Sequence, residues 1–283
     1  MRKPSFRTLW LILVLSFSVS ACGVSMIYNR LDWVVPFYVD DFVTLDEDQQ
    51  IKLHNKLNSL LAWHRSTQLS VYSKMLRKAR TDVSNGLSAE KIQEIFQGFD
   101  QGWEALMAAA APPIADLLLT ISSEQKTELF QNLKSLNAEY QEKYIAISDE
   151  EKLEKIVEKM QDNFSDWLGD LSEAQEKMIS TYAAQLVPIH ADRYAFRLQW
   201  QEQLKQILYH EAQPEAMRKQ LMELFAQAKR LYPQAYKDKL QANRLVVQNM
   251  LLAMNSGISK AQMAHLANKL EHYAASFDEL SQG

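Results

Sequence analysis

Three basic side chains share one face of a long helical pattern in the second half of the chain. His190, Arg193 and Arg197 stand at i, i+3 and i+7, and residues at such spacings lie on the same side of an α-helix. That face runs close to three apolar residues, Ile189, Phe196 and Trp200. Guanidinium groups beside an apolar stripe can bind a phosphate or carboxylate. The competing interpretation, which the sequence favours, is that the arginines pair with carboxylates of a neighbouring helix.

Two adjacent carboxylates, Asp40 and Asp41, form a second candidate for chemistry. Such a pair could serve acid–base reactions or hold a cation. They stand just before the first long helical pattern, however, and negative charge is favoured at a helix N-terminus. We therefore interpret them mainly as structural residues.

Neither a metal site nor a catalytic motif is found in the sequence. None of the six histidines has another His, Asp, Glu or Cys three or four residues away, the spacing that places two ligands on one helix face. Two Ser-x-x-Lys pairs occur without the Ser-Asp-Asn and Lys-Thr-Gly sequences that accompany them in penicillin-recognising enzymes. We expect no catalytic residues, no metal and no cofactor, and we predict that the protein is not an enzyme.

The N-terminus carries the most specific motif. Arg2, Lys3 and Arg7 precede an apolar run over residues 9–19, and Val19-Ser20-Ala21-Cys22 follows. This run resembles the lipobox of bacterial lipoproteins, in which a peptidase cuts before a cysteine that then becomes lipidated. An apolar stretch of this length is too short to span a bilayer comfortably, which argues against a transmembrane anchor.

The resemblance implies a signal peptide over residues 1–21 and a lipid attached to Cys22. Gly23 follows the cysteine where aspartate would mark retention at the inner membrane. The implied location is therefore the outer membrane of the bacterial cell envelope, facing the periplasm. The expected partners are the membrane, through the lipidated N-terminus, and an envelope protein.

The composition agrees with export and argues against nucleic acid as a partner. Cys22 is the single cysteine, so no disulfide can form within the chain. Loss of the three basic residues of the signal peptide would lower the net charge from −4 to −7, which makes nucleic-acid binding a poor fit. The densest basic run, over residues 74–80, lies in a helical pattern and is interpreted as a solvated face.

Residues 44–283 are expected to form one helical domain. An apolar residue, a capping residue, two spacers and then Gln or Glu recur at Asp46, Ser122, Ser148, Ser172 and Ser259, with a weaker copy at Ser88. This pattern is typical of capping boxes that open helices. Gly86, Gly169 and Gly257 precede three of these starts and can end the previous helix in a left-handed conformation.

The predicted fold is an all-α, compact bundle of about seven to nine helices, mostly antiparallel neighbours, without a sheet. Pro112 and Pro113 are expected to break one helix. Pro188 is expected to kink the long pattern over residues 172–211.

Residues 22–43 form a separate aromatic and acidic segment. The run Tyr28-Asn29-x-Leu31-Asp32-Trp33, followed by Asp40-Asp41 and closed by Leu45 and Gln49, resembles the start of an uncharacterised family of proteobacterial lipoproteins. That family has no established activity, so the resemblance implies location and a helical fold alone. The aromatic residues of the segment either pack on the helical body or insert between lipid headgroups. We favour packing of Trp33, because the aspartates would face anionic headgroups.

The function that the sequence supports first is a non-enzymatic, structural or partner-binding role in the cell envelope. The alternative is a helical carrier that holds a small amphipathic ligand near Arg193 and Arg197. An enzyme without a recognisable motif is the third and weakest reading.

Overall fold

The computed structural model describes residues 21–282, with side chains from residue 23 onward. Over this range it has twelve α-helices, one short 3-10 helix and no strand. In chain order the elements are α2 (Ala21–Tyr28), α3 (Leu31–Val39), α4 (Glu47–Thr67), α5 (Leu69–Ser84), α6 (Ala89–Leu118), α7 (Ser123–Tyr144), α8 (Asp149–Leu168), α9 (Glu173–Ala183), α10 (His190–His210), α11 (Pro214–Ala226), η1 (Ala228–Leu231), α12 (Gln234–Ser256) and α13 (Lys260–Gln282). The all-α prediction is confirmed, but the helices outnumber the seven to nine expected.

Two stretches that the sequence predicted as single long helices each form two separate helices. The first long helix is interrupted at Gln68 between α4 and α5. Just before this point, Ser66 and Thr67 turn their hydroxyls back onto backbone carbonyls of the preceding turn, which tends to bend a helix. The pattern around Pro188 is not kinked but broken, since α9 ends at Ala183 and α10 begins at His190. Here the Asn243 side chain takes over both backbone hydrogen bonds of Val187, at 2.7 and 2.8 Å.

The two consecutive prolines do not break their helix. Helix α6 runs without interruption from Ala89 to Leu118 and contains Pro112 and Pro113. The preceding turn consists of four alanines, Ala108 to Ala111, whose small side chains leave room for the two rings. The predicted break was therefore wrong.

The predicted helix starts are confirmed. Each of the six capping side chains accepts a hydrogen bond from the backbone N–H three residues further on, namely Asp46, Ser88, Ser122, Ser148, Ser172 and Ser259. Gly86 and Gly169 have φ of +95° and +81°, which a residue with a Cβ adopts at a cost. Gly257 has φ of −107°, so the left-handed conformation predicted for it was wrong.

The glutamines of these capping boxes also join helices to one another. The Gln49 and Gln125 side chains exchange two hydrogen bonds of 3.0 and 2.6 Å between α4 and α7. Gln175 and Gln262 do the same at 3.0 and 2.9 Å between α9 and α13. Each pair therefore fixes two helix N-termini against each other.

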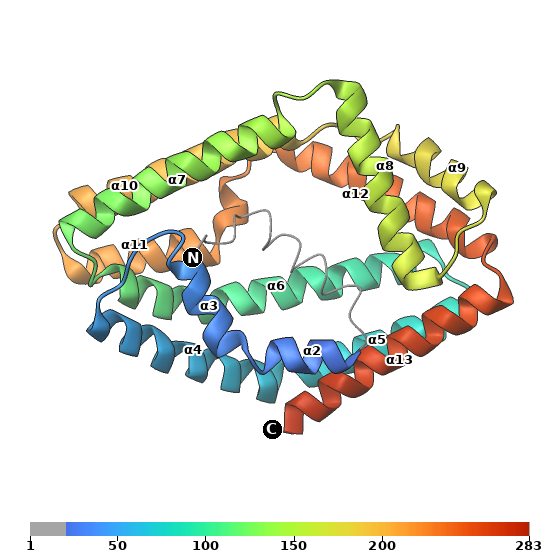
Figure 1. Cartoon of the computed structure of the whole chain (residues 1–283), viewed down its shortest axis with the longest axis horizontal. Helices are drawn as coiled ribbons and strands as arrows, with labels where there is room; N and C mark the ends of the chain where they lie inside the picture. The colour runs from blue at the N-terminus through green and yellow to red at the C-terminus, as the bar shows by residue number, and fades with distance from the viewer. Residues whose placement is uncertain (1–20, 283) are drawn as a thin grey trace, which may run out of the picture.

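Two clusters of buried apolar residues stand out in the described part of the chain. One lies among α6, α7, α10 and α11, around residues such as Leu133, Leu208 and Leu221. The other lies among α8, α9, α12 and α13, around Leu168, Ile179 and Met254. Figure 1 shows α6 running along the long axis of the molecule, with α7 and α10 side by side along another edge.

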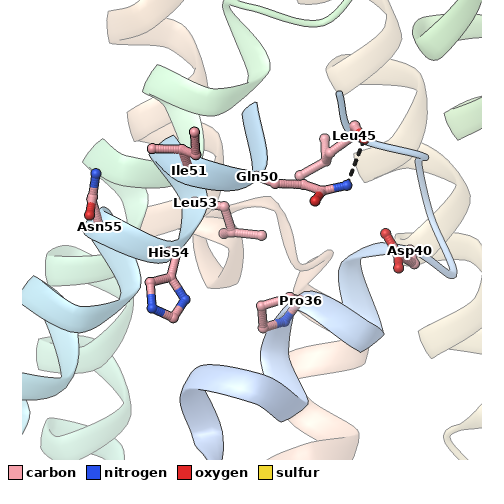
Figure 2. Close-up of a pocket in the computed structure, with 8 residues that line it drawn as sticks. All are labelled: Pro36, Asp40, Leu45, Gln50, Ile51, Leu53, His54 and Asn55. Carbon is pink, nitrogen blue, oxygen red and sulfur yellow. Dashed lines mark hydrogen bonds between the residues drawn. The ribbon is translucent and has the colours of Figure 1, made fainter. Parts of the chain in front are cut away.

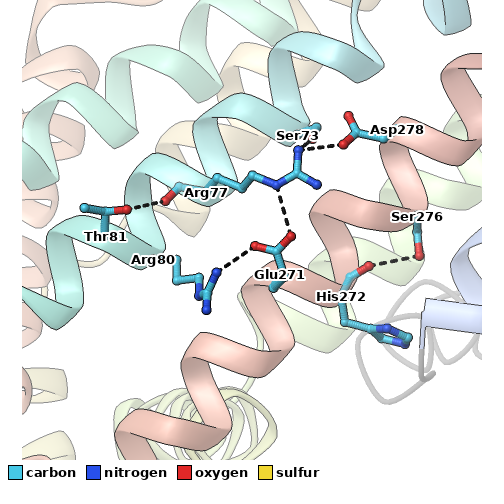
Figure 3. Close-up of polar contacts among 8 residues, drawn as sticks. All are labelled: Ser73, Arg77, Arg80, Thr81, Glu271, His272, Ser276 and Asp278. Atoms are coloured by element: carbon cyan, nitrogen blue, oxygen red, sulfur yellow. Dashed lines mark hydrogen bonds and ion pairs between the residues drawn. The ribbon is translucent and has the colours of Figure 1, made fainter.

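Helix α13 closes the structure by packing along α5, far from it in sequence (Figure 1). Arg77 of α5 contacts Glu271 at 3.0 Å and Asp278 at 2.6 Å, and Arg80 contacts Glu271 at 2.9 Å (Figure 3). The basic run keeps the solvent exposure that the sequence predicted, since 42% of the Arg77 and 46% of the Arg80 side-chain surface is exposed; the ion pairs with α13 are an additional feature. Within residues 21–282, no helix combines the length and the apolar composition needed to cross a bilayer.

Candidate functional site

A pocket forms where the start of α10 meets α12 and the chain just before it. We call it the arginine pocket; its volume is about 330 Å³, and it is open to solvent rather than enclosed. It is lined by Arg193, Phe196, Arg197, Trp200, Tyr232 and Tyr236. The face that the sequence singled out on α10 thus supplies four of the six lining residues.

Local chain geometry positions both sides of this pocket. Pro188 and the Asn243 contacts at Val187 end the preceding segment, so that α10 begins at His190 and presents the two arginines in its first two turns. Pro233 is the N-cap of α12 and sets Tyr232 and Tyr236 on either side of the helix start. The two tyrosine rings lie 4.9 Å apart, and Phe196 meets Tyr232 edge-on at 4.5 Å.

A second group of tyrosines lies on the α7 side of the arginines. The Tyr140 hydroxyl is 3.0 Å from Nδ1 of His190, and the Tyr144 ring stacks on the same imidazole at 4.9 Å with an interplanar angle of 6°. Tyr194 stacks on Tyr140 at 6.1 Å. These contacts hold the end of α7 against the beginning of α10.

The arginines lie beside aromatic residues instead of carboxylates. The Arg197 guanidinium lies 5.7 Å from the centre of the Tyr140 ring, and Arg193 lines the pocket together with Tyr232 and Tyr236. The neighbouring Asp192 pairs with Lys239 at 2.7 Å. Among the described residues, neither Arg193 nor Arg197 forms an ion pair with a carboxylate, so the interpretation favoured from the sequence was wrong.

Cations crowd this part of the molecule and shift one another's ionisation. Burial lowers the pKa of His190, and the charges of Arg193, Lys152 and Lys159 lower it further. Burial also lowers the pKa of Lys159, with added effects of Lys143 and Arg193. Because like charges oppose one another here, an anion bound among them would be stabilised by several cations at once.

Two helix starts add to the positive potential. The N-caps of α10 and α12, Ile189 and Pro233, provide no side-chain hydrogen bond to the first turn. The backbone N–H groups of that turn carry the positive end of the helix dipole. Their contribution supports that of the side chains.

The sequence identified the cations but missed the tyrosines around them. Tyr140, Tyr144 and Tyr236 follow ordinary helical spacing in the sequence, which does not by itself mark them as site residues. Two Tyr-x-x-x-Tyr spacings, at residues 140 and 144 and at 232 and 236, were the available signal. A tyrosine repeated one helical turn apart near a helix end combines an apolar ring with a polar tip, which suits a half-buried site.

Asp40 and Asp41 lie elsewhere, at the end of α3. Asp40 is the C-cap of α3, whereas α4 begins at Glu47 with Asp46 as its N-cap. The predicted stabilisation by the N-terminal dipole of the next helix was therefore wrong. Asp40 lines an open pocket of about 410 Å³ between α3 and α4, which Figure 2 shows with Pro36 on one side and His54 on the other.

This α3–α4 pocket brings together few groups that could do chemistry. Its remaining lining residues are Leu45, Gln50, Ile51, Leu53 and Asn55, and Gln50 donates to the Leu45 carbonyl at 2.9 Å (Figure 2). No group of His, Cys, Asp and Glu that could hold a metal ion occurs among the described residues.

Trp33 does not pack on the helical body. Its side chain is 69% exposed, and no residue of α3 is buried. The preference for packing was therefore wrong for this residue. The ends of the same segment do pack, since Tyr28 contacts His64 and Phe42 lies against the first core cluster.

The predicted signal peptide and lipobox lie largely outside the described residues. Cys22 falls in the first turn of α2, and its side chain is not among those described. From Cys22 to Tyr28 the helical backbone rises about 9 Å. An anchor at Cys22 would thus stand close to the point where Tyr28 meets α4.

The fold and the pocket define an all-helical protein with an open site of cations and aromatic rings. Residues 41–237 match the model of a family of unknown function, DUF6279, and the chain belongs to this family. All residues of the arginine pocket fall within the matched region, whereas α2 and α3 precede it. No curated protein and no solved structure was found to be similar to this chain.

Proposed function

We propose that this chain is a lipid-anchored protein of the bacterial cell envelope that acts by binding rather than by catalysis. The lipobox-like run ending at Cys22 supports the anchor, and Gly23 after it supports the outer membrane. The resemblance of residues 28–49 to proteobacterial lipoproteins supports the same location.

The proposed ligand is an anionic group, held at the arginine pocket. The observation that carries this proposal is that Arg193 and Arg197 line an open pocket without a carboxylate partner among the described residues. Arginine side chains bind carboxylates and phosphates through paired, charge-assisted hydrogen bonds. Trp200 and Tyr232 offer flat apolar surfaces beside them, so the ligand is expected to carry its anionic group next to a ring.

The shape of the pocket bears on the choice between a carrier and a partner-binding protein. Carriers of small molecules usually enclose most of the ligand surface. This pocket is open to solvent, which suits an anionic group that projects from a larger molecule, such as an envelope polysaccharide or protein. A carrier of a small amphipathic anion remains the second candidate, because the same arginines and rings would contact it.

Arg197 also contacts the Tyr140 ring and so stabilises the fold, and the test must separate this role from binding. Glucuronate and glucose 6-phosphate are the anionic probes, and glucose is the neutral control with the same ring. A ligand that binds the native state alone raises its melting temperature. We expect the anionic probes to raise the melting temperature of the wild type and glucose to leave it unchanged.

In Arg193→Gln and Arg197→Gln the upward shift should largely disappear. A lost charge-assisted hydrogen bond costs about 1.5–3 kcal/mol, or roughly tenfold or more in affinity. Arg218→Gln is the matched control, because Arg218 pairs with Asp116 at 2.7 Å and does not line the pocket. If pocket variants merely melt earlier while their shift with the anions persists, the arginines are structural and the proposal fails.

A further inference from the structure

Helix α3 is apolar on all its sides and yet lies on the surface. Every residue from Leu31 to Val39 except Asp32 is apolar or aromatic; none is buried, Trp33 is exposed and the other eight are half-buried. A helix that is apolar all round normally lies in a core or in a membrane. Trp33 is 69% exposed and stacks on Phe37 at 6.2 Å, and Met26 at the end of α2 is 60% exposed.

The chain on both sides of α3 is tied to the helical body. On one side the Tyr28 hydroxyl lies 2.8 Å from Nδ1 of His64, and Arg65 donates to the Asn29 side chain at 2.7 Å. On the other side Asn132 donates to the Phe42 carbonyl at 3.0 Å. The exposure of α3 is therefore a fixed feature of the fold.

Thr44 adds two further hydrogen bonds between the chain that follows α3 and the helical body. Its hydroxyl and its backbone N–H donate to the Glu128 carboxylate of α7 at 2.7 and 3.0 Å. Helix α3 itself packs on α4, and the open pocket of Figure 2 separates part of the two helices. The body thus presents α3 outward between two fixed points.

We propose that α3 lies flat in the interfacial layer of a lipid membrane, with Trp33 and Phe37 inserted at the headgroup boundary. This rests on the proposed anchor, because Cys22 stands one short helix before α3 and would hold that end of the molecule at the bilayer. Aromatic rings are favoured at this depth, and apolar faces of interfacial helices enter the boundary by about 5–10 Å.

The acidic residues near α3 define which lipid surface it fits. Asp40 lines the α3–α4 pocket, and Asp41 follows the helix end. Both are exposed, and strongly anionic headgroups would repel them. The surface that matches α3 is therefore zwitterionic, and contact should be weaker on vesicles rich in anionic lipid.

The single cysteine of the chain makes a sharp test possible. In the lipidated protein Cys22 carries the anchor, so the cysteine of Trp33→Cys is the free thiol to which a nitroxide attaches. Full-length protein is placed in phosphatidylcholine vesicles, and the label's access to a water-soluble nickel chelate and to oxygen is measured. Leu245→Cys is the control, since Leu245 is 53% exposed on α12, which packs on α6 and α9.

We expect the label at position 33 to be several-fold less accessible to the chelate than the label at position 245, and more accessible to oxygen. Equal accessibility of the two labels in vesicles to which the protein is bound contradicts the α3 proposal alone. Failure of the protein to float with the vesicles contradicts both this proposal and the anchor.

Other occupants of this surface give different results. Protection of the label in detergent that grows with protein concentration would show a second copy covering α3. Protection in native envelopes that is absent in vesicles would show a protein partner. Either result overturns membrane contact.

Discussion

At the scale of residues, the charge of His190 depends on the cations and the burial that surround it. Burial and the neighbouring Arg193, Lys152 and Lys159 lower its pKa, and burial lowers the pKa of His64. Both values thus fall below the ordinary histidine value of about 6.5. In the window below that value the unfolded chain binds more protons than the folded one, so stability falls as the pH falls.

This predicts a melting temperature that drops between about pH 7 and pH 5, where carboxylates in the unfolded chain are still mostly ionised. The drop in melting temperature should be smaller in His190→Gln than in the wild type. It should be smaller still in the double variant His64→Gln with His190→Gln. His210→Gln is the control, because His210 is exposed at the end of α10. Thermal unfolding followed by circular dichroism gives the values. Parallel pH curves for wild type and double variant would contradict the assignment.

Among the helices, the caps other than Ser88 fall into two groups according to the residue three positions after the capping residue, which is glutamine in one group and glutamate in the other. The four boxes that end in glutamine are all paired across helices, as Gln49 with Gln125 and Gln175 with Gln262. The cap at Ser148 is followed by Glu151, which instead contacts Lys155 at 2.8 Å. A neutral amide can donate and accept in a buried place, which a carboxylate cannot do without its charge being compensated.

Gln175→Ala is expected to destabilise the protein by about 1–3 kcal/mol, because the buried amide of Gln262 loses the two hydrogen bonds that it exchanges with Gln175. Glu151 holds the same position after Ser148 without the reciprocal bond of a capping box, and its ion pair with Lys155 is exposed. Glu151→Ala should therefore cost less than about 0.5 kcal/mol. Urea unfolding of both variants measures the difference. Equal losses in the two variants would show that the glutamine pair adds nothing beyond the cap itself.

The helix starts could be predicted from the sequence because a capping box is local. All six predicted caps are present, whereas the pairing of their glutamines joins residues 76 and 87 positions apart and leaves no local signal. The position of Asp40 was predicted wrongly because α3 is a short helix that contains a proline and has no capping residue from which its start could be predicted. Pro112 and Pro113 were misjudged because their effect depends on the small residues before them.

Across the whole molecule, the arginine pocket combines residues that the sequence places on one helix face with tyrosines that only the packing of other helices brings beside them. The spacing of His190, Arg193 and Arg197 placed them on one helix face, which the structure confirms. The tyrosines found where carboxylates were expected come from α7 and from the region of α12. Their position beside the arginines depends on how helices that are distant in sequence pack together. The exposure of Trp33 depends likewise on which parts of the body its flanking residues contact.

Burial contributes more than ion pairing where α13 packs on α5. Arg77 and its partners Glu271 and Asp278 keep 42%, 36% and 36% of their side-chain surface exposed, and ion pairs of this kind contribute about 0–1 kcal/mol each. Apolar residues of α13 such as Leu270, which is 6% exposed, typically contribute about 2–5 kcal/mol. The seam between α5 and α13 is thus held mainly by packing and is oriented by its charges.

The proposed anchor predicts how the whole protein partitions. Wild-type protein should enter the detergent phase of an envelope extract, while Cys22→Ser should remain as an uncleaved precursor or a soluble protein. Phase separation followed by intact-mass analysis checks this and shows the added lipid. Recovery of the wild type in the soluble periplasmic fraction would contradict the anchor.

Calorimetric titration measures directly whether Arg193 and Arg197 bind an anion. Glucuronate is titrated into the wild type, into Arg193→Gln with Arg197→Gln, and into Arg218→Gln, with glucose as the ligand control. We expect saturable binding of glucuronate to the wild type and to Arg218→Gln, no binding of glucose, and roughly tenfold or more weaker binding of glucuronate to the double variant. Glucuronate binding of equal strength to all three proteins, or to none of them, would contradict anion binding by the two arginines.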